Sequence, residues 1–231
     1  MKTLLRIGVV LLALGLATLL LVAVLDLPTP AIQLSASVAA NLAQSGVEHP
    51  VTAVLLNFRG YDTLLEIAVL LLALLGMLAV AGPQTAPHVR TDPVPHVRPD
   101  PVLQTLARLG APLMILAAGY LLWAGAHRPG GAFQAGAVLV AAAVLLNLAG
   151  LLPVWSTPGR LLRFGLAGGF LLFLAVAAGL LFEAELLRYP PEHAGGLILL
   201  IEAGLTVSIG LILAGLFLLF GARHAAAEEE T

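Results

Sequence analysis

The chain has 231 residues, of which 60% are hydrophobic and only 10% are charged, against about 25% charged in ordinary globular proteins. Its formal net charge is −2, so it lacks the basic face that binding to nucleic acid requires. It contains no cysteine, which excludes disulfides, thiol catalysis and cysteine-ligated iron–sulfur clusters, and we expect no cofactor. This composition indicates a membrane protein.

Six apolar stretches are each long enough to cross the hydrocarbon core as a helix, which takes about 20 residues. They lie at about 4–25, 62–82, 103–125, 132–152, 161–182 and 196–220. The predicted fold is therefore an all-α membrane protein with six transmembrane helices. The first stretch begins like a signal peptide, but its apolar run from Ile7 to Leu25 is longer than usual, and we expect a retained helix.

An even number of spans places both termini on the same side of the membrane. Of the 11 lysine and arginine residues, only Arg59, Arg128 and Arg188 then fall on the other side. Because cytoplasmic loops are enriched in lysine and arginine, both termini are predicted to be cytoplasmic. The expected location is the cell (inner) membrane.

Two connecting segments divide the chain into modules. Residues 26–61 are too polar to cross lipid and are expected to form a short helix at the outer surface, ended by Gly46. Residues 83–101 are rich in proline and contain the octapeptide PHVRTDPV, followed at once by PHVRPDPV. Such proline density favours an extended spacer over the alternative, a metal site on His88 and His96. The predicted organisation is a two-helix module (1–82), a linker (83–101) and a four-helix module (102–231).

Four polar residues stand at the start of the second span: Asn57, Arg59, Asp62 and Glu66. Thr63 and Glu66 have the spacing of a capping box, which accounts for Thr63 and partly for Asp62 and Glu66 but leaves Asn57 and Arg59 unexplained. The alternative is that Arg59 and Asp62 form an ion pair, or mark a break in the helix where water enters, and that the group takes part in conducting ions.

Glu202 lies about 9 Å inside the last span, where a charge costs up to about 2.5–3.5 kcal/mol. Thr206 lies one turn further along the same face and is, with Glu202, a candidate residue of an ion route. Glu202 is either protonated and hydrogen-bonded to a neighbouring helix, or a carboxylate on an ion or proton route. Small residues at four-residue spacing, Gly204 with Ser208 and Gly165 with Gly169, predict close helix packing.

The short outer loop between the third and fourth spans contains His127, Pro129, Gly130, Gly131 and Phe133. A single histidine at a membrane surface is either a structural hydrogen-bonding group or a proton relay. The chain contains no nucleophile–base pattern or cluster of metal ligands, so it is not expected to be an enzyme. Its single lysine, Lys2, is terminal, and the chain looks incomplete as a self-sufficient transporter.

Two stretches resemble the Mrp family of multisubunit Na⁺/H⁺ antiporters and the related membrane arms of energy-converting hydrogenases. VLLNFRGYDTLLEIAVLLLALLG, residues 54–76, resembles the carboxy-terminal element of the large, A-type antiporter subunit. Residues 102–221, with LARLGAPLMILAAGYLLWAGAHRPGGAFQAGAV and the IEAGL sequence around Glu202, resemble the B-type subunit. The sequence departs from the family pattern at Asn57, where aspartate is usual, at Ala132 and Ala135, where glycine is usual, and in its additional amino-terminal helices.

The resemblance implies an accessory subunit of a Na⁺/H⁺ antiporter complex, which lines or supports the ion route beside other membrane subunits. Asp62, Glu66 and Glu202 would then be candidate ligands of transported Na⁺ or H⁺, and Arg59 would tune their charge. Two alternatives stay open: the same module in a redox-driven or hydrogenase-type complex, and a purely structural scaffold.

Overall fold

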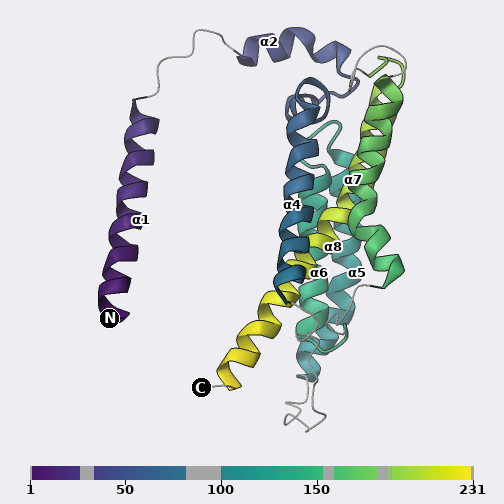
Figure 1. Cartoon of the computed structure of the whole chain (residues 1–231). Coiled ribbons are helices and arrows are strands. Elements are labelled where there is room, and N and C mark those ends of the chain that lie inside the picture. The colour runs from purple at the N-terminus through teal and green to yellow at the C-terminus, as the bar shows by residue number, and fades with distance from the viewer. Residues whose placement is uncertain are drawn as a thin grey trace. The chain divides into compact units, whose positions relative to one another are not determined.

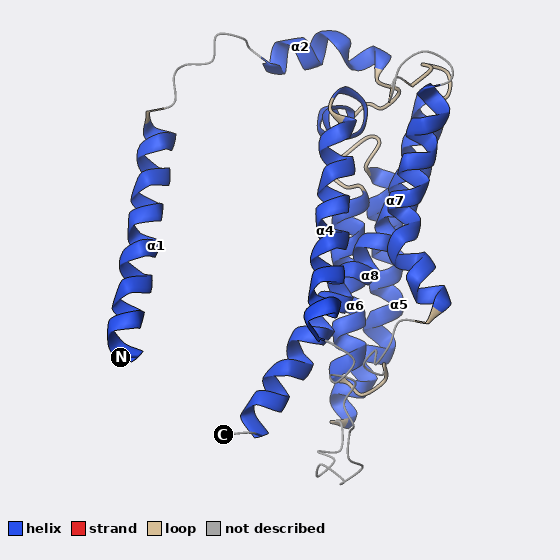
Figure 2. Ribbon diagram, in the orientation of Figure 1, coloured by secondary structure: helices blue, strands red, loops and turns tan. Residues whose placement is uncertain are grey.

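The computed structural model describes residues 2–26, 34–81, 100–152, 159–181, 187 and 189–229. All regular secondary structure in these ranges is helical (Figures 1 and 2). The longer helices are α1 (Lys2–Leu25), α4 (Gly60–Ala81), α5 (Pro101–Ala124), α6 (Ala132–Leu148), α7 (Arg160–Leu181) and α8 (Ala194–Glu229). The shorter elements are α2 (Leu34–Asn41), η1 (Leu42–Gln44), α3 (Pro50–Thr52) and the π-helix η2 (Ala53–Phe58).

Five of these helices are long and apolar enough to cross a membrane: α1, α4, α5, α7 and α8. The prediction of an all-α membrane protein is therefore confirmed. The predicted fourth span, 132–152, contains α6, which has only 17 residues and ends at Leu148. At 1.5 Å per residue α6 is about 25 Å long, shorter than a hydrocarbon core of about 30 Å. Gly150, with a φ of 67°, lies two residues after the end of this helix.

The chain forms two compact units, Met1–Ser37 and Val38–Thr231. In the second unit α8 contacts α4, α5, α6 and α7. Figure 1 shows α8, in yellow, passing through the middle of this bundle. Its buried side chains, among them Ile201, Leu205 and Ile209, form the core together with Phe173 of α7. The element that carries Glu202 is thus the central helix of the bundle.

Small residues let the helices around α8 approach closely. A Cβ atom added at Gly169 of α7 would lie 2.6 Å from the carbonyl oxygen of Gly204 in α8. The Ser208 hydroxyl donates a hydrogen bond to the Leu166 carbonyl across the same contact. The packing role predicted for Gly169, Gly204 and Ser208 is therefore confirmed.

The connecting segments are described in part. A short helix does occupy the first of them: α2 and η1 precede Gly46, whose φ is 76°. Residues 82–99, with most of the repeat and both His88 and His96, lie outside the described residues. In contrast to the predicted end near residue 220, α8 continues to Glu229.

Candidate functional site

The second span is preceded by an irregular helical segment. After α3, residues Ala53–Phe58 form a π-helix, in which the Arg59 N–H bonds the Val54 carbonyl, five residues back, at 2.8 Å. Arg59 then leaves helical geometry, with φ −133° and ψ 37°, and α4 starts at Gly60. The break predicted at this threshold is present. Such π-helical turns occur frequently at functional sites.

The predicted capping box is wrong, because the helix begins earlier than the spacing suggested. With Gly60 as the first residue of α4, Thr63 lies inside the helix and cannot be its N-cap. Its hydroxyl instead donates to the Leu55 carbonyl in the π-helix at 2.7 Å. Thr63 therefore holds the irregular segment against α4.

Two of the four polar residues at this threshold have structural partners. Arg59 and Asp62 form the predicted ion pair, with their side chains 66% and 44% exposed, so the pair contributes little stability. Asn57, which stands where the family usually has aspartate, donates from its side-chain amide to the Ser45 carbonyl at 2.9 Å. Asn57 thus fixes the chain before α3 through its amide nitrogen.

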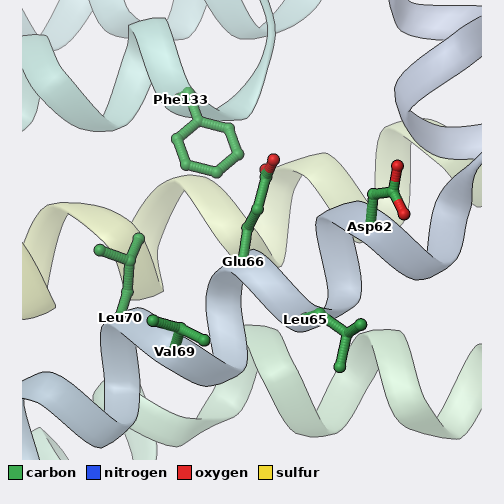
Figure 3. Close-up of a pocket in the computed structure, with 6 residues that line it drawn as sticks. All are labelled: Asp62, Leu65, Glu66, Val69, Leu70 and Phe133. Atoms are coloured by element: carbon green, nitrogen blue, oxygen red, sulfur yellow. The ribbon is translucent and has the colours of Figure 1, made fainter. Parts of the chain in front are cut away.

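Asp62 and Glu66 line one wide groove between α4 and the start of α6. The groove has a volume of about 580 Å³, and its apolar wall includes Leu65, Val69 and Phe133. Figure 3 shows both carboxylates projecting from the same side of α4, with Glu66 directed toward the ring of Phe133. Glu66 is exposed and makes no ion pair with any described residue.

Glu202 is buried, with only 4% of its surface exposed. The backbone N–H of Ala132, the first residue of α6, donates to its carboxyl group. The second oxygen, Oε2, is buried and has no hydrogen-bond partner in the described part of the chain. Thr206 does not contact this carboxyl through its hydroxyl, which donates to the Glu202 backbone carbonyl at 2.8 Å. The predicted ion-route role of Thr206 therefore has no support in its hydrogen bonding.

The loop between α5 and α6 brings the glycines to Glu202. Gly131 has φ 102° and ψ −170°, and a Cβ atom added there would lie 2.5 Å from Glu202 Oε1. Its N–H bonds the Leu121 carbonyl at 2.9 Å, and a Cβ atom at Gly130 would meet the same carbonyl. Because neither position has room for a side chain, the two glycines allow the loop to fold back tightly between α5 and Glu202.

The rest of this loop has structural contacts. His127 Nδ1 lies 3.1 Å from Glu48 Oε2, and its ring stacks obliquely on Trp123. Both His127 and Pro129 are exposed. His127 does not line the Glu202 cavity, and its contacts with Glu48 and Trp123 are those of a structural hydrogen-bonding group.

A second, much smaller cavity of about 40 Å³ lies between the π-helix and α8. Its polar side chains are Thr52, Thr63, Gln134 and Glu202, and Phe133 lines both this cavity and the wide groove. The structure therefore divides the predicted carboxylates into two sets: Asp62 and Glu66 in the open groove, and Glu202 in the smaller, less open cavity.

Sequence reasoning did not identify Thr52 or the role of Thr63 at this cavity. Thr52 stands alone in a segment without a recognisable motif, and Thr63 matched a capping pattern. The one available signal was the presence of hydroxyl groups in otherwise apolar stretches, which is common and unspecific.

Comparison of the sequence with known protein families finds a match over residues 102–222, more than half of the chain, to a domain described as related to the MnhB subunit of Na⁺/H⁺ antiporter. No curated protein is detectably similar to the chain in sequence.

Two solved structures share the fold. One belongs to the Mrp complex from a Dietzia species, with a TM-score of 0.68 and 22% identity over 94% of this chain. This chain covers only 26% of that longer chain. The other belongs to a membrane-bound sulfane sulfur reductase, an archaeal respiratory membrane complex, with a TM-score of 0.68 and 24% identity. The match covers 94% of this chain and 98% of that chain.

The family match spans α5 to α8, and so includes the glycine loop, Glu202 and the central helix of the bundle. This chain belongs to the family of domains related to the MnhB subunit of Na⁺/H⁺ antiporters.

Proposed function

We propose that this multi-pass membrane protein is an accessory component of a multisubunit cation/proton antiporter complex that exchanges Na⁺ for H⁺. Its partners are other membrane subunits, and it contributes to the ion route rather than catalysing a chemical reaction. Membership of the MnhB-related family supports this function, as does the shared fold of a chain in the Mrp complex.

One observation carries the proposal: Glu66 is exposed on a helix suited to crossing the membrane. It lies about 9 Å along α4 from Gly60, and no described residue pairs with it. A carboxylate facing lipid at such a depth costs up to about 2.5–3.5 kcal/mol. The cost falls when water or polar groups of a neighbouring subunit occupy the groove, so the surface is suited to an assembly.

The proposal includes six crossings with both termini in the cytoplasm, in the cell (inner) membrane. The short helix α6 can cross if the bilayer thins locally or neighbouring helices shield its ends. It also includes the modules 1–82, 83–101 and 102–231, the first of them resembling the carboxy-terminal element of the large antiporter subunit.

The main alternative is the same protein in a redox-driven complex. It is favoured by the fold shared with a chain of an archaeal respiratory membrane complex over nearly the full length of both chains. Identifying the proteins that co-purify with this chain distinguishes the two functions. Soluble redox subunits in a stable complex would support the alternative, and their absence from an active, fully assembled exchanger would support the antiporter.

The test of an ion-route role uses the assembled complex in inverted membrane vesicles. Glu66→Gln and Glu202→Gln should each reduce Na⁺-dependent proton exchange at least about tenfold, because each removes a charge from the proposed route. Glu192→Gln, an exposed residue before α8, is the matched control and should leave exchange unchanged. Normal exchange in both variants, with the complex assembled, would instead show that the chain is a structural scaffold.

A further inference from the structure

We propose that the cavity beside Glu202 binds a small monovalent cation through the Glu202 carboxylate and the hydroxyl oxygens of Thr52 and Thr63. The inference rests on the proposed function and deepens it, since it assigns a ligand to one of the two candidate sites. Its evidence is the chemistry of the cavity wall, and its test does not depend on transport.

The cavity has the size for one ion with little water. A space of about 10–15 Å³ holds one water molecule, so the volume of about 40 Å³ accommodates only a few such oxygens or a cation among them. It is more enclosed than the groove at Glu66, and the side chains of Thr52, Thr63 and Glu202 on its wall are all at least 95% buried. An occupant beside these three side chains would therefore exchange part of its hydration shell for protein oxygens.

Both threonine hydroxyls on the cavity wall donate their proton elsewhere and keep acceptor lone pairs. The Thr52 hydroxyl donates its proton to the Gly125 carbonyl at 2.5 Å, and the Thr63 hydroxyl donates to the Leu55 carbonyl at 2.7 Å. A hydroxyl has a single proton, so each oxygen keeps only acceptor capacity for an occupant. His49 Nδ1 lies 3.5 Å from the Thr52 hydroxyl, and its role depends on the tautomer of the ring. If Nδ1 carries the proton, it donates to the Thr52 oxygen and leaves one lone pair for an occupant; if not, both lone pairs remain.

The interrupted helix explains why the Thr63 hydroxyl can donate its proton to the Leu55 carbonyl. The Arg59 N–H reaches back to the Val54 carbonyl, so the hydrogen bond of the Leu55 carbonyl comes from Thr63. In a regular α-helix the Arg59 N–H would donate to the Leu55 carbonyl, four residues back. The π-helix therefore provides an acceptor for the Thr63 proton, and the Thr63 oxygen keeps its lone pairs for an occupant.

Glu202 supplies the single negative charge of the site. The Ala132 N–H at the start of α6 orients its carboxyl group, and Gly131 leaves room for Oε1. Oε2 remains buried without a partner in the described part of the chain. One carboxylate and two neutral hydroxyl oxygens form a hard, oxygen-only ligand set whose charge balances a monovalent ion.

Gln134 completes the polar wall. Its side chain is exposed at the rim, and its amide can turn either the oxygen or the NH₂ group inward. We therefore assign no ligand role to it. The competing description of the site is a neutral Glu202 whose own proton satisfies a threonine oxygen, with no ion bound.

The test is a sodium-induced infrared difference spectrum of the purified complex at constant pH and ionic strength, with choline replacing Na⁺. Na⁺ should perturb a carboxyl band that Glu202→Gln abolishes. Thr63→Val should raise the half-saturating Na⁺ concentration roughly tenfold, because one ligand oxygen is lost, and Thr63→Ser should restore it. Ser208→Ala also removes a buried hydroxyl that bonds a carbonyl, but lies away from the cavity, and should leave the midpoint unchanged.

Three results would overturn the proposal: no Na⁺-dependent band from Glu202, a band that responds to pH but not to Na⁺, or equal midpoint shifts in Thr63→Val and Ser208→Ala. The first two would establish the neutral carboxyl or a proton site. If the band is absent while the vesicles still exchange Na⁺ for H⁺, the cation site fails and the antiporter function stands. If Na⁺ binds at the site but the vesicles do not exchange Na⁺ for H⁺, the cation site stands and the antiporter function fails.

Discussion

Gly131 has a backbone conformation, with φ 102° and ψ −170°, that is essentially restricted to glycine. The position is also sterically closed, because Glu202 Oε1 occupies the place where a Cβ atom would stand. A single residue thus links the loop before α6 to the buried carboxylate of α8. Phe133, two residues later, lies at the boundary between the wide groove and the Glu202 cavity.

Gly131→Ala should destabilise the chain by about 1–3 kcal/mol through backbone strain and should displace the Glu202 carboxyl. Thermal unfolding of the purified complex measures the first effect. Gly119→Ala is the control, because a Cβ atom at Gly119 in α5 meets nothing within 4 Å. Equal melting temperatures for the two variants would show that Gly131 is under no such constraint.

At the scale of helices, the bundle depends on how closely α7 approaches α8. A Cβ atom at Gly169 would lie 2.6 Å from the Gly204 carbonyl oxygen and 2.7 Å from Ser208 Cβ. Both neighbouring atoms belong to α8, and one is backbone, so the helices themselves would have to move apart. Because α8 also carries Glu202 and contacts α6, such a shift would reach the cavity.

Gly169→Ala is therefore expected to cost about 1–3 kcal/mol, as overpacking of a closely packed interface does. Gly168→Ala is a matched control one residue away, where an added Cβ atom meets nothing within 4 Å. It should be neutral, or more stable by up to about 1 kcal/mol, because alanine restricts the unfolded chain. Chemical unfolding in detergent compares the two, and equal loss in both would contradict the close α7–α8 contact.

At the scale of the whole molecule, the two compact units differ in how they bury apolar surface. The buried core draws on residues from Val47 onward, all within the unit Val38–Thr231. None of the side chains in the apolar, membrane-spanning part of α1 (Arg6–Leu25) is buried inside the chain. The second unit therefore contains the packing that holds both candidate sites.

Deletion of residues 1–37 should leave the fold of the remaining unit intact, because no core residue is removed. Hydrogen exchange of the backbone amides in α7 and α8 should match that of the full chain. Loss of protection in these helices on deletion would show that the first unit is required for the core.

Sequence reasoning identified the helices well, because long apolar runs leave few alternatives in a membrane. The runs at 62–82, 103–125 and 161–182 correspond to α4, α5 and α7 within a few residues. The concentration of polar groups around Arg59 also marked the place where the helix is interrupted. These features are local, and the chemistry of neighbouring residues is sufficient to specify them.

Sequence reasoning was less successful where the outcome depends on backbone hydrogen bonding. It placed Thr63 in a capping box, because it could not show that α4 begins at Gly60 or that Thr63 bonds a π-helical carbonyl. It also extended the fourth span to residue 152, although α6 ends at Leu148. Apolar composition alone does not reveal where a helix changes hydrogen-bonding pattern or stops.

The sequence by itself determined a membrane-spanning helical chain with carboxylates in unusual positions. Only the tertiary structure decided which groups meet: Glu202 with the glycine loop about 70 residues earlier in the chain, and with Thr52 and Thr63 across the cavity. The physical reason is that these contacts depend on the packing of α4, α6 and α8 and on an irregular turn. Helix periodicity specifies which residues share a face, but the partner of that face is set by the close approach of helices distant in the sequence.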